Sequence, residues 1–421
     1  MTSSKKSMVA YAERLALSPD DRRELLRAAV AYDQRVAKLA RAAAEGNAAK
    51  ADHLTSHLLT AWASKVVAAA RGVAKEKTWS GTLEDIKQRA GLLDPFKPVE
   101  EPVTVDFEPK GNGKLRPLLK FGWRRRALQR MCSDVLRVRL PRYSFDYMER
   151  DAGGMSSAAE ALGNLMLGGK YDYIVCIDVA DCYPSLNQSA MAAILPLPKA
   201  VIENVLLVGE ETEVHIAQGA NTLLGRYPHL QPTFPDQAAR QGLPQGARTS
   251  PLVASRAVLG PLLDGAGLSE RIIAYGDDAA IAAKTQAEAS DILNVLQSRY
   301  EKCPVGPLKI SRRQIYSVFQ PVQFGQYSVK QRPHAFGGGL HFAPSGKSWL
   351  RYGDKIAAIC VYQDEATIDL NVENYQDQWR KSFPLWEHPD VELNLELGTL
   401  QAVQEGMELR KRLMAQNAKS A

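Results

Sequence analysis

The sequence predicts an α+β fold in which a helical N-terminal region precedes a region of short strands and further helices. Apolar residues recur at helical spacing after Ser18, three prolines interrupt the chain between positions 95 and 102, and short apolar runs begin at Val103. With 421 residues and a hydrophobic fraction of 45%, the chain is long enough for two or three packed units with a sizeable core.

Residues 1–95 are predicted to be helical. Ser18 and Pro19 are typical of a helix start, because a serine side chain can cap the first turn and proline suits its first position. A second helix is expected from Leu54 to Val73, and a third from Thr82 to near Gly91. We expect this region to end at the prolines, which cannot sit inside a helix.

Strands and helices are expected to be mixed after the prolines. Short strands and loops are expected over 103–109 and 111–121, with Lys110, Lys114 and Arg116 in a Gly-rich turn. A buried strand is expected over 171–178, and a hairpin is expected to join 271–275 to 279–283. The expected helices run from Trp123 to Leu140, from Ser250 to about Gly265 and from Thr399 to Met414. The strand 171–178 ends on Asp178, and the hairpin turn holds Gly276, Asp277 and Asp278.

Positive charge is concentrated in one window of the chain. The net charge is only +6, yet the segment from Lys110 to Arg142 contains eleven Lys and Arg residues and a single acid, Asp134. Such a basic stripe is typical of a protein that binds a partner with phosphate groups. A solvated charged face would have the same composition. Arginines that recur along the expected helix could track the phosphates: Arg124, Arg125, Arg126, Arg130, Arg137 and Arg139.

The cysteines and the apolar segments predict a cytoplasmic protein with no membrane partner. The five cysteines are dispersed and include no C-x-x-C pair, which suits buried thiols in a reducing compartment. The first twenty residues contain no apolar signal-like core, and no stretch approaches the roughly 20 apolar residues of a membrane span.

Three acids are the strongest candidates for chemistry. Asp178 at a strand end and Asp277 and Asp278 at a hairpin tip could meet at one edge of a sheet. Phosphoryl transfer uses two divalent cations about 3.5–4 Å apart. Mg²⁺ prefers carboxylate oxygens as ligands. An ordinary exposed turn would also tolerate this sequence. Asp181 is expected on the opposite face if the strand continues past Asp178.

The order of short segments resembles that of the reverse transcriptase family over most of residues 105–330. Asp178 to Tyr183 resembles its motif A, Gly242 to Gly246 with Ser250-Pro251 its motif B, and Tyr275 to Asp278 its motif C. Further resemblances are Gly306 to Lys309 with motif D, Phe324 to Tyr327 with the motif E primer grip, and Lys114 to Pro117 with the segment that holds the incoming triphosphate.

The resemblance implies a right-hand polymerase with fingers, palm and helical thumb after the N-terminal region. The expected boundaries are 1–95, fingers 96–177, palm 178–330 with an insertion at 184–240, and thumb and C-terminal helices 331–421. The implied activity is RNA-directed DNA synthesis with two Mg²⁺ ions, or Mn²⁺ in their place. Its partners would be an RNA template, nascent DNA and deoxynucleoside triphosphates. A non-coding RNA or a partner protein would be a further partner.

The resemblance also implies roles for individual residues. The implied catalytic residues are Asp178, Asp277, Asp278 and Lys309, and the implied metal ligands are Asp178, Val179, Asp277 and Asp278. The implied substrate-binding residues are Lys110, Lys114, Arg116, Tyr183, Gln245 and Gly246, with Tyr183 as a steric gate against the 2′-hydroxyl. The implied nucleic-acid contacts are Arg124, Arg125, Arg126, Arg130, Phe324 and Gly325.

Two other functions stay open on the sequence. Gly276 is typical of viral RNA-dependent RNA polymerases, whereas Tyr183 and the Gly-Leu-Pro-Gln-Gly segment favour reverse transcriptases. The large helical N-terminal region would also suit a polymerase-shaped RNA-binding protein without turnover. A stand-alone bacterial enzyme, similar to retron or phage-defence reverse transcriptases, is the expected type, and antiphage defence is its expected role by analogy alone.

Overall fold

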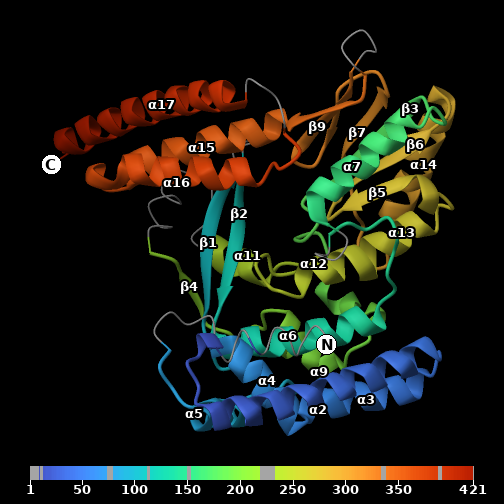
Figure 1. Cartoon of the computed structure of the whole chain (residues 1–421), viewed down its shortest axis with the longest axis vertical. Coiled ribbons are helices and arrows are strands. Elements are labelled where there is room, and N and C mark those ends of the chain that lie inside the picture. Colours follow the sequence, from blue (N-terminus) through green and yellow to red (C-terminus); the bar gives the residue numbers. More distant parts are fainter. Residues whose placement is uncertain are drawn as a thin grey trace. The chain divides into compact units, whose positions relative to one another are not determined.

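The computed structural model shows a chain that folds as two compact units, each built from several chain segments (Figure 1). The first unit comprises Met1–Tyr143, Ala180–Gly265 and Ser298–Lys309, and the second comprises Ser144–Val179, Ala266–Gln297 and Ile310–Ala421. The structure describes residue 9 and residues 13–73, 79–110, 114–148, 153–218, 233–332, 338–386 and 391–420. The compact units cross the boundaries expected from the sequence, and the division into fingers, palm and thumb stays a prediction.

Two of the N-terminal helices begin where the sequence predicts. The helices are α2 (Pro19–Ala44), α3 (Ala48–Thr60), α4 (Trp62–Val73) and α5 (Leu83–Gly91). The Ser18 hydroxyl accepts a hydrogen bond from the Asp21 amide at 3.1 Å, and so caps α2. Thr82 and Asp85 form a reciprocal capping box at the start of α5. Both predicted helix starts are confirmed.

The single helix predicted from Leu54 to Val73 is wrong, because the chain is extended at Ala61 (ψ 135°) and α3 ends there. Helix α3 packs mainly on α2, whereas α4 packs on α2, α5 and α6 (Trp123–Arg139). One straight helix of twenty residues would be about 30 Å long and could not follow both sets of neighbours.

A partly buried polar network around Asp134 ties the N-terminal helices to α6. The Tyr32 hydroxyl donates to Asp134 Oδ2 at 2.8 Å, and Arg71 Nη1 lies 2.9 Å from the same oxygen. The Arg71 guanidinium also lies over the Tyr32 ring, 5.4 Å from its centroid. The predicted basic helix after Trp123 is confirmed, and much of its surface is covered by the helices before it.

A small sheet with strand order β2-β1-β4 completes the first unit. Strands β1 (Val103–Lys110) and β2 (Lys114–Phe121) form an antiparallel hairpin, and β4 (Val214–Ile216) adds to β1 in parallel. Alternate residues of β1 are buried, as the sequence pattern predicts for one covered face. Phe107 of this face stacks on Phe234, in the first turn of α11 (Phe234–Arg240), with ring centroids 5.5 Å apart.

The helix predicted from Ser250 is confirmed but is not a regular α-helix throughout. It consists of α12 (Ser250–Leu252), the π-helical η4 (Val253–Leu259) and α13 (Gly260–Asp264). Pro261 has no N–H to donate to the preceding turn, and the wider π-helical turns lie directly before it.

The second unit is built on an antiparallel sheet with strand order β5-β6-β3-β7. Its strands are β5 (Ile272–Tyr275), β6 (Asp278–Ala283), β3 (Tyr173–Val179) and β7 (Ile310–Ser317). Ile174, Cys176, Ala280 and Ala282 are fully buried in one core with residues of α7 (Gly154–Leu167). The predicted strand before Asp178 and the predicted hairpin are both confirmed.

A three-stranded sheet and C-terminal helices share this core. Strands β8 (Val322–Phe324), β9 (Tyr327–Gln331) and β10 (Leu340–Pro344) precede helices α15 (Gly346–Tyr362), α16 (Ile368–Lys381) and α17 (Val391–Ser420). Aromatic rings fill the space between sheet and helices, with Trp379 and Tyr352 centroids 4.5 Å apart. All five cysteines of the chain have buried side chains.

The last helix starts earlier than the predicted Thr399, because Gly398 lies inside α17 and does not end a helix. A Cβ at Gly398 would lie 3.1 Å from the Trp349 ring, and one at Gly406 would lie 2.9 Å from the Ala357 Cα. Both glycines therefore allow α15 and α17 to pack closely. Among the described residues, no helix is long and apolar enough to span a membrane.

Candidate active site

The turn between β5 and β6 carries two of the three predicted acids. Tyr275 pairs with Asp278 across the hairpin, so Gly276 and Asp277 form a two-residue loop. Gly276 has a positive φ of 63°, which glycine adopts without the strain that a Cβ would cause. The hairpin ends directly beside the third acid, because Asp278 of β6 and Asp178 of β3 are register partners.

The three carboxylates form one cluster in the second unit. Asp178, Asp277 and Asp278 each offer an oxygen, and these oxygens all lie within 4.8 Å of one another. The pairing of β3 with β7 shifts register directly after Asp178, so the sheet becomes irregular at this edge. The structure thus brings together the acids that the sequence singles out.

The cluster is a suitable site for divalent cations. Its donor set is three carboxylates, which are hard oxygen ligands of the kind that Mg²⁺ and Mn²⁺ take. Three negative charges at this separation repel one another, and a bound cation would relieve that repulsion. Val179, also predicted as a ligand, has a buried side chain, and only its main-chain carbonyl is chemically able to serve.

Arg312 of β7 lies within the cluster, although it was not among the site residues predicted from the sequence. Its Nη2 lies 2.8 Å from Asp278 Oδ1, and Arg312 is also the register partner of Asp178. The signal in the sequence is the alternation of Arg312, Gln314 and Tyr316 along a strand. That signal can be used only when the register between β7 and β3 is known.

Burial dominates the electrostatics of Asp278. Its pKa is raised to about 6, because loss of solvent outweighs the lowering effect of Arg312. The charges of Asp178 and Asp277 raise this pKa further, and Lys347 at the start of α15 lowers it. Beside Asp178, the neutral hydroxyl of Ser311 donates to the main-chain carbonyl of Asp178 at 3.0 Å and lies 3.3 Å from its Oδ2.

Tyr183 and the predicted motif B segment pack together in the first unit. The Leu243 amide donates to the Tyr183 carbonyl at 2.9 Å. A Cβ at Gly242 would lie 2.0 Å from that carbonyl oxygen, so only glycine permits this approach. The turn that follows β3 includes Asp181, whose φ is +43°, so the premise that the strand continues to Asp181 is wrong.

Gln245 and Gly246 pack on the β1–β2 hairpin. The Leu119 amide of β2 donates to the Gln245 carbonyl at 2.7 Å, and a Cβ at Gly246 would lie 2.4 Å from the Leu119 carbonyl. Arg116 is on the same strand, paired with Glu108. The structure describes the backbone of Lys110 and Lys114, whereas their side chains lie outside the described part of the chain.

The other predicted catalytic and primer-grip residues have different environments. Lys309 has an exposed side chain, and its carbonyl accepts a hydrogen bond from the Ala180 amide at 2.8 Å. Phe324 has a fully buried side chain in the core of the second unit, and the predicted contact of this residue with nucleic acid stays a prediction. Gly325 occupies the turn after it, with a φ of 55°.

Arg125 and Arg130, which were predicted to contact phosphates, are both buried. Arg125 is 2% exposed and donates to the Leu207 carbonyl at 2.6 Å, and burial lowers its pKa to about 10. Arg130 donates to the Arg71 carbonyl. Arg137 and Arg139 form ion pairs with Asp134 and Asp52. Arg124 and Arg126 are partly exposed, and their predicted contacts stay predictions.

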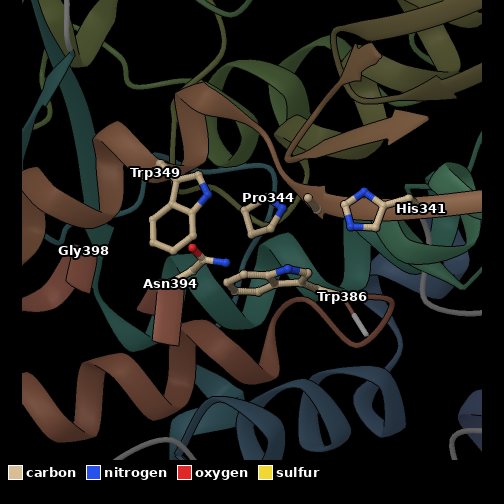
Figure 2. A pocket seen from close by; sticks show the side chains of 7 residues that line it. His341, Pro344, Trp349, Trp386, Asn394 and Gly398 are labelled. Atoms are coloured by element: carbon tan, nitrogen blue, oxygen red, sulfur yellow. The ribbon is translucent and has the colours of Figure 1, made fainter. Parts of the chain in front are cut away.

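A cavity of about 390 Å³ lies in the second unit and shares no residue with the acid cluster. Figure 2 shows the Trp349 and Trp386 rings, Pro344, His341 and Asn394 around it. Its position beside α15 and α17 was not predicted, because it depends on how these helices pack.

A comparison with known protein families matches the middle of the chain. Residues 108–311 match the family model of the reverse transcriptase (RNA-dependent DNA polymerase), and the matched segment contains Asp178, Asp277 and Asp278. A search of curated proteins found no match to the chain. The chain thus carries a reverse transcriptase domain and is a nucleotidyltransferase of the RNA-directed DNA polymerase class.

Proposed function

We propose that the protein copies an RNA template into DNA by two-metal phosphoryl transfer. One observation carries the proposal: Asp178, Asp277 and Asp278 lie within 4.8 Å of one another inside the segment that matches the reverse transcriptase family. We assign two Mg²⁺ ions to this cluster, with Mn²⁺ as a substitute. Bound there, the cations would neutralise charge on the attacking and leaving oxygens.

The chain's own residues supply positioning for the incoming nucleotide. Tyr183 is proposed as the steric gate against a 2′-hydroxyl, and the close packing of Gly242 against its carbonyl supports a fixed backbone at this position. Gln245 and Gly246 are proposed to contact the nucleotide, supported by the hydrogen bond that fixes their loop to β2.

Basic residues are proposed to bind the phosphates. Lys110, Lys114 and Arg116, around the β1–β2 hairpin, are the candidates for the triphosphate, and Lys309 is the candidate for proton donation to the leaving pyrophosphate. Arg124 and Arg126 are the remaining candidates of α6 for the template backbone. We propose that the enzyme is cytoplasmic and acts in antiphage defence together with a non-coding RNA or a partner protein.

RNA-dependent RNA synthesis is the second candidate, and Gly276 is its main support. The positive φ of Gly276 explains why glycine is favoured at this position, whether the product is RNA or DNA. We therefore place more weight on Tyr183, and the match of residues 108–311 to reverse transcriptases favours DNA synthesis.

A primed RNA template supplied with deoxynucleotides or with ribonucleotides tests the proposal. We expect a product that deoxyribonuclease removes and ribonuclease spares, and that Asp277→Asn abolishes. A ribonuclease-sensitive product would support the second candidate. If the parent protein and Asp277→Asn both bind RNA and neither extends a primer, the protein is an RNA-binding module.

A further inference from the structure

Asp278, Asp178 and Arg312 lie side by side on three neighbouring strands. Asp178 on β3 opposes Asp278 on β6 at one edge and Arg312 on β7 at the other. Directly opposed residues of antiparallel strands place their side chains on the same face of the sheet. Arg312 therefore reaches over the central strand to bring its Nη2 within 2.8 Å of Asp278 Oδ1.

This contact engages one oxygen of Asp278 with a cation that belongs to the protein. The side chains of Arg312 and Asp278 are 21% and 16% exposed, so solvent screens the pair only in part. A guanidinium stays charged at any physiological pH and forms strong hydrogen bonds with carboxylates. A divalent cation that approaches this oxygen must compete with Arg312.

The partner of Asp178 is different. Ser311 places a neutral hydroxyl 3.3 Å from Asp178 Oδ2, and a hydroxyl can orient a carboxylate without neutralising it. The two acids are register partners, yet one lies beside a positive charge and the other beside a hydroxyl. The cluster is therefore electrostatically asymmetric.

We propose that Arg312 is a positioning residue that holds Asp278 and leaves Asp178 and Asp277 as the principal cation ligands. The inference rests on the proposed metal-dependent function and assigns separate roles within its acid cluster. Without Arg312, Asp278 becomes a third competing ligand. The cations then bind more tightly but are drawn out of their productive positions.

Mn²⁺ binding to the purified full-length protein, measured by electron paramagnetic resonance without nucleotide or nucleic acid, tests this role. We expect Arg312→Gln to bind Mn²⁺ about tenfold more tightly, equivalent to about 1.4 kcal/mol. Arg312→Lys keeps the positive charge and should stay near the parent. Primer extension by Arg312→Gln should show a reduced kcat and an unchanged KM for the deoxynucleotide.

Arg313→Gln is the matched control. Arg313 is the next residue of β7, is exposed, and alternation places it on the opposite face of the sheet. Arg313→Gln removes the same charge as Arg312→Gln but from the other face of the sheet. We therefore expect it to leave both Mn²⁺ affinity and kcat unchanged. Equal effects of Arg312→Gln and Arg313→Gln would reduce the role of Arg312 to bulk charge and overturn the inference, as would unchanged or weaker Mn²⁺ binding by folded Arg312→Gln.

Asp278→Asn gives a second test that needs no Arg312 variant. We expect it to change Mn²⁺ affinity by less than about threefold, whereas Asp178→Asn and Asp277→Asn should each weaken binding more than about tenfold. Equal weakening by all three variants contradicts the division of roles but keeps the metal site. Unchanged binding in all three contradicts the proposed metal-dependent function itself, so the two failures are distinguishable.

Discussion

Gly242 packs so closely on Tyr183 that a Cβ at Gly242 would lie 2.0 Å from the Tyr183 carbonyl oxygen. Gly242 also has a positive φ of 60°, so steric space and backbone conformation both require glycine here. Because Leu243 donates to the same carbonyl, the contact links the turn after β3 to the segment before α12.

Gly242→Ala should therefore displace the backbone of Tyr183. We expect primer extension to fall roughly 100-fold, because a displacement of about 1 Å in a positioning element can have that effect. Gly209→Ala is the control, since Gly209 lies in the same unit and a Cβ there meets nothing within 4 Å. Steady-state kinetics of the two variants measure the difference, and equal activity would show that the contact does not position Tyr183.

Tyr183→Ala should admit ribonucleotides, because it removes the aromatic ring proposed to exclude the 2′-hydroxyl. Tyr183→Phe keeps the ring and should keep the selection for deoxynucleotides. The measurement is the ratio of kcat/KM for a deoxynucleotide and its ribonucleotide on one primed template. A ratio that Tyr183→Ala leaves unchanged would assign the gate to another residue.

Asp134→Asn should destabilise the first unit. Tyr32 and Arg71 both donate to Asp134 Oδ2, and Arg71 is only 9% exposed, so the substitution removes a negative charge beside a nearly buried guanidinium. We expect a loss of about 2 kcal/mol in the free energy of unfolding, as is usual for a partly buried ion pair with one member removed. Denaturant unfolding measures this loss.

Asp20→Asn serves as the control for Asp134→Asn. The ion pair of Asp20 with Arg23 is highly exposed, with side chains 84% and 71% accessible. Such pairs contribute little to stability, so this variant should unfold at the same denaturant concentration as the parent. If both variants behave alike, the Asp134 network does not hold the N-terminal helices on α6.

Acid should stabilise the metal-free protein through Asp278. The pKa of Asp278 is about 6 in the folded chain, against an ordinary value of 3.8 for an aspartate in an unfolded chain. Between these two pH values the folded state binds more protons than the unfolded state, so this residue makes stability rise as pH falls through 6. The rise should be on the order of 2 kcal/mol.

Thermal unfolding between pH 7 and pH 4, with a chelator present, checks this dependence. The slope of stability against pH in the parent protein is compared with the same slope in Asp278→Asn, which lacks the titrating carboxyl group. Loss of the ion pair with Arg312 should change the stability of that variant by a similar amount at each pH. The difference between the two slopes therefore reports the titration of the Asp278 carboxyl group. Identical slopes would mean that burial does not raise the pKa of Asp278.

Local sequence signals predicted the elements of the fold better than they predicted contacts between them. The helix starts at Ser18 and Thr82 and the hairpin around Gly276 depend on a few adjacent residues, and all three are confirmed. Gly398 shows the limit of local signals, because a glycine that allows two helices to pack closely has the same sequence signal as one that ends a helix.

The acid cluster was predictable because its members stand at a strand end and a hairpin tip. The arginines of α6 were not, because helical spacing does not reveal which face other elements cover, and Arg125 and Arg130 proved to be buried. Arg312 was missed for a related reason. Its approach to Asp278 depends on strand order and register, which no local pattern specifies.

DNA synthesis on a primed RNA template, compared between the parent protein and Asp277→Asn, tests the central claim most directly. Asp277 belongs to the acid cluster. Its replacement by Asn removes the carboxylate with little change in side-chain volume. We predict Mg²⁺-dependent, deoxyribonuclease-sensitive product from the parent and none from the variant. Equal DNA synthesis by both proteins would contradict the assignment of the cluster as the catalytic centre.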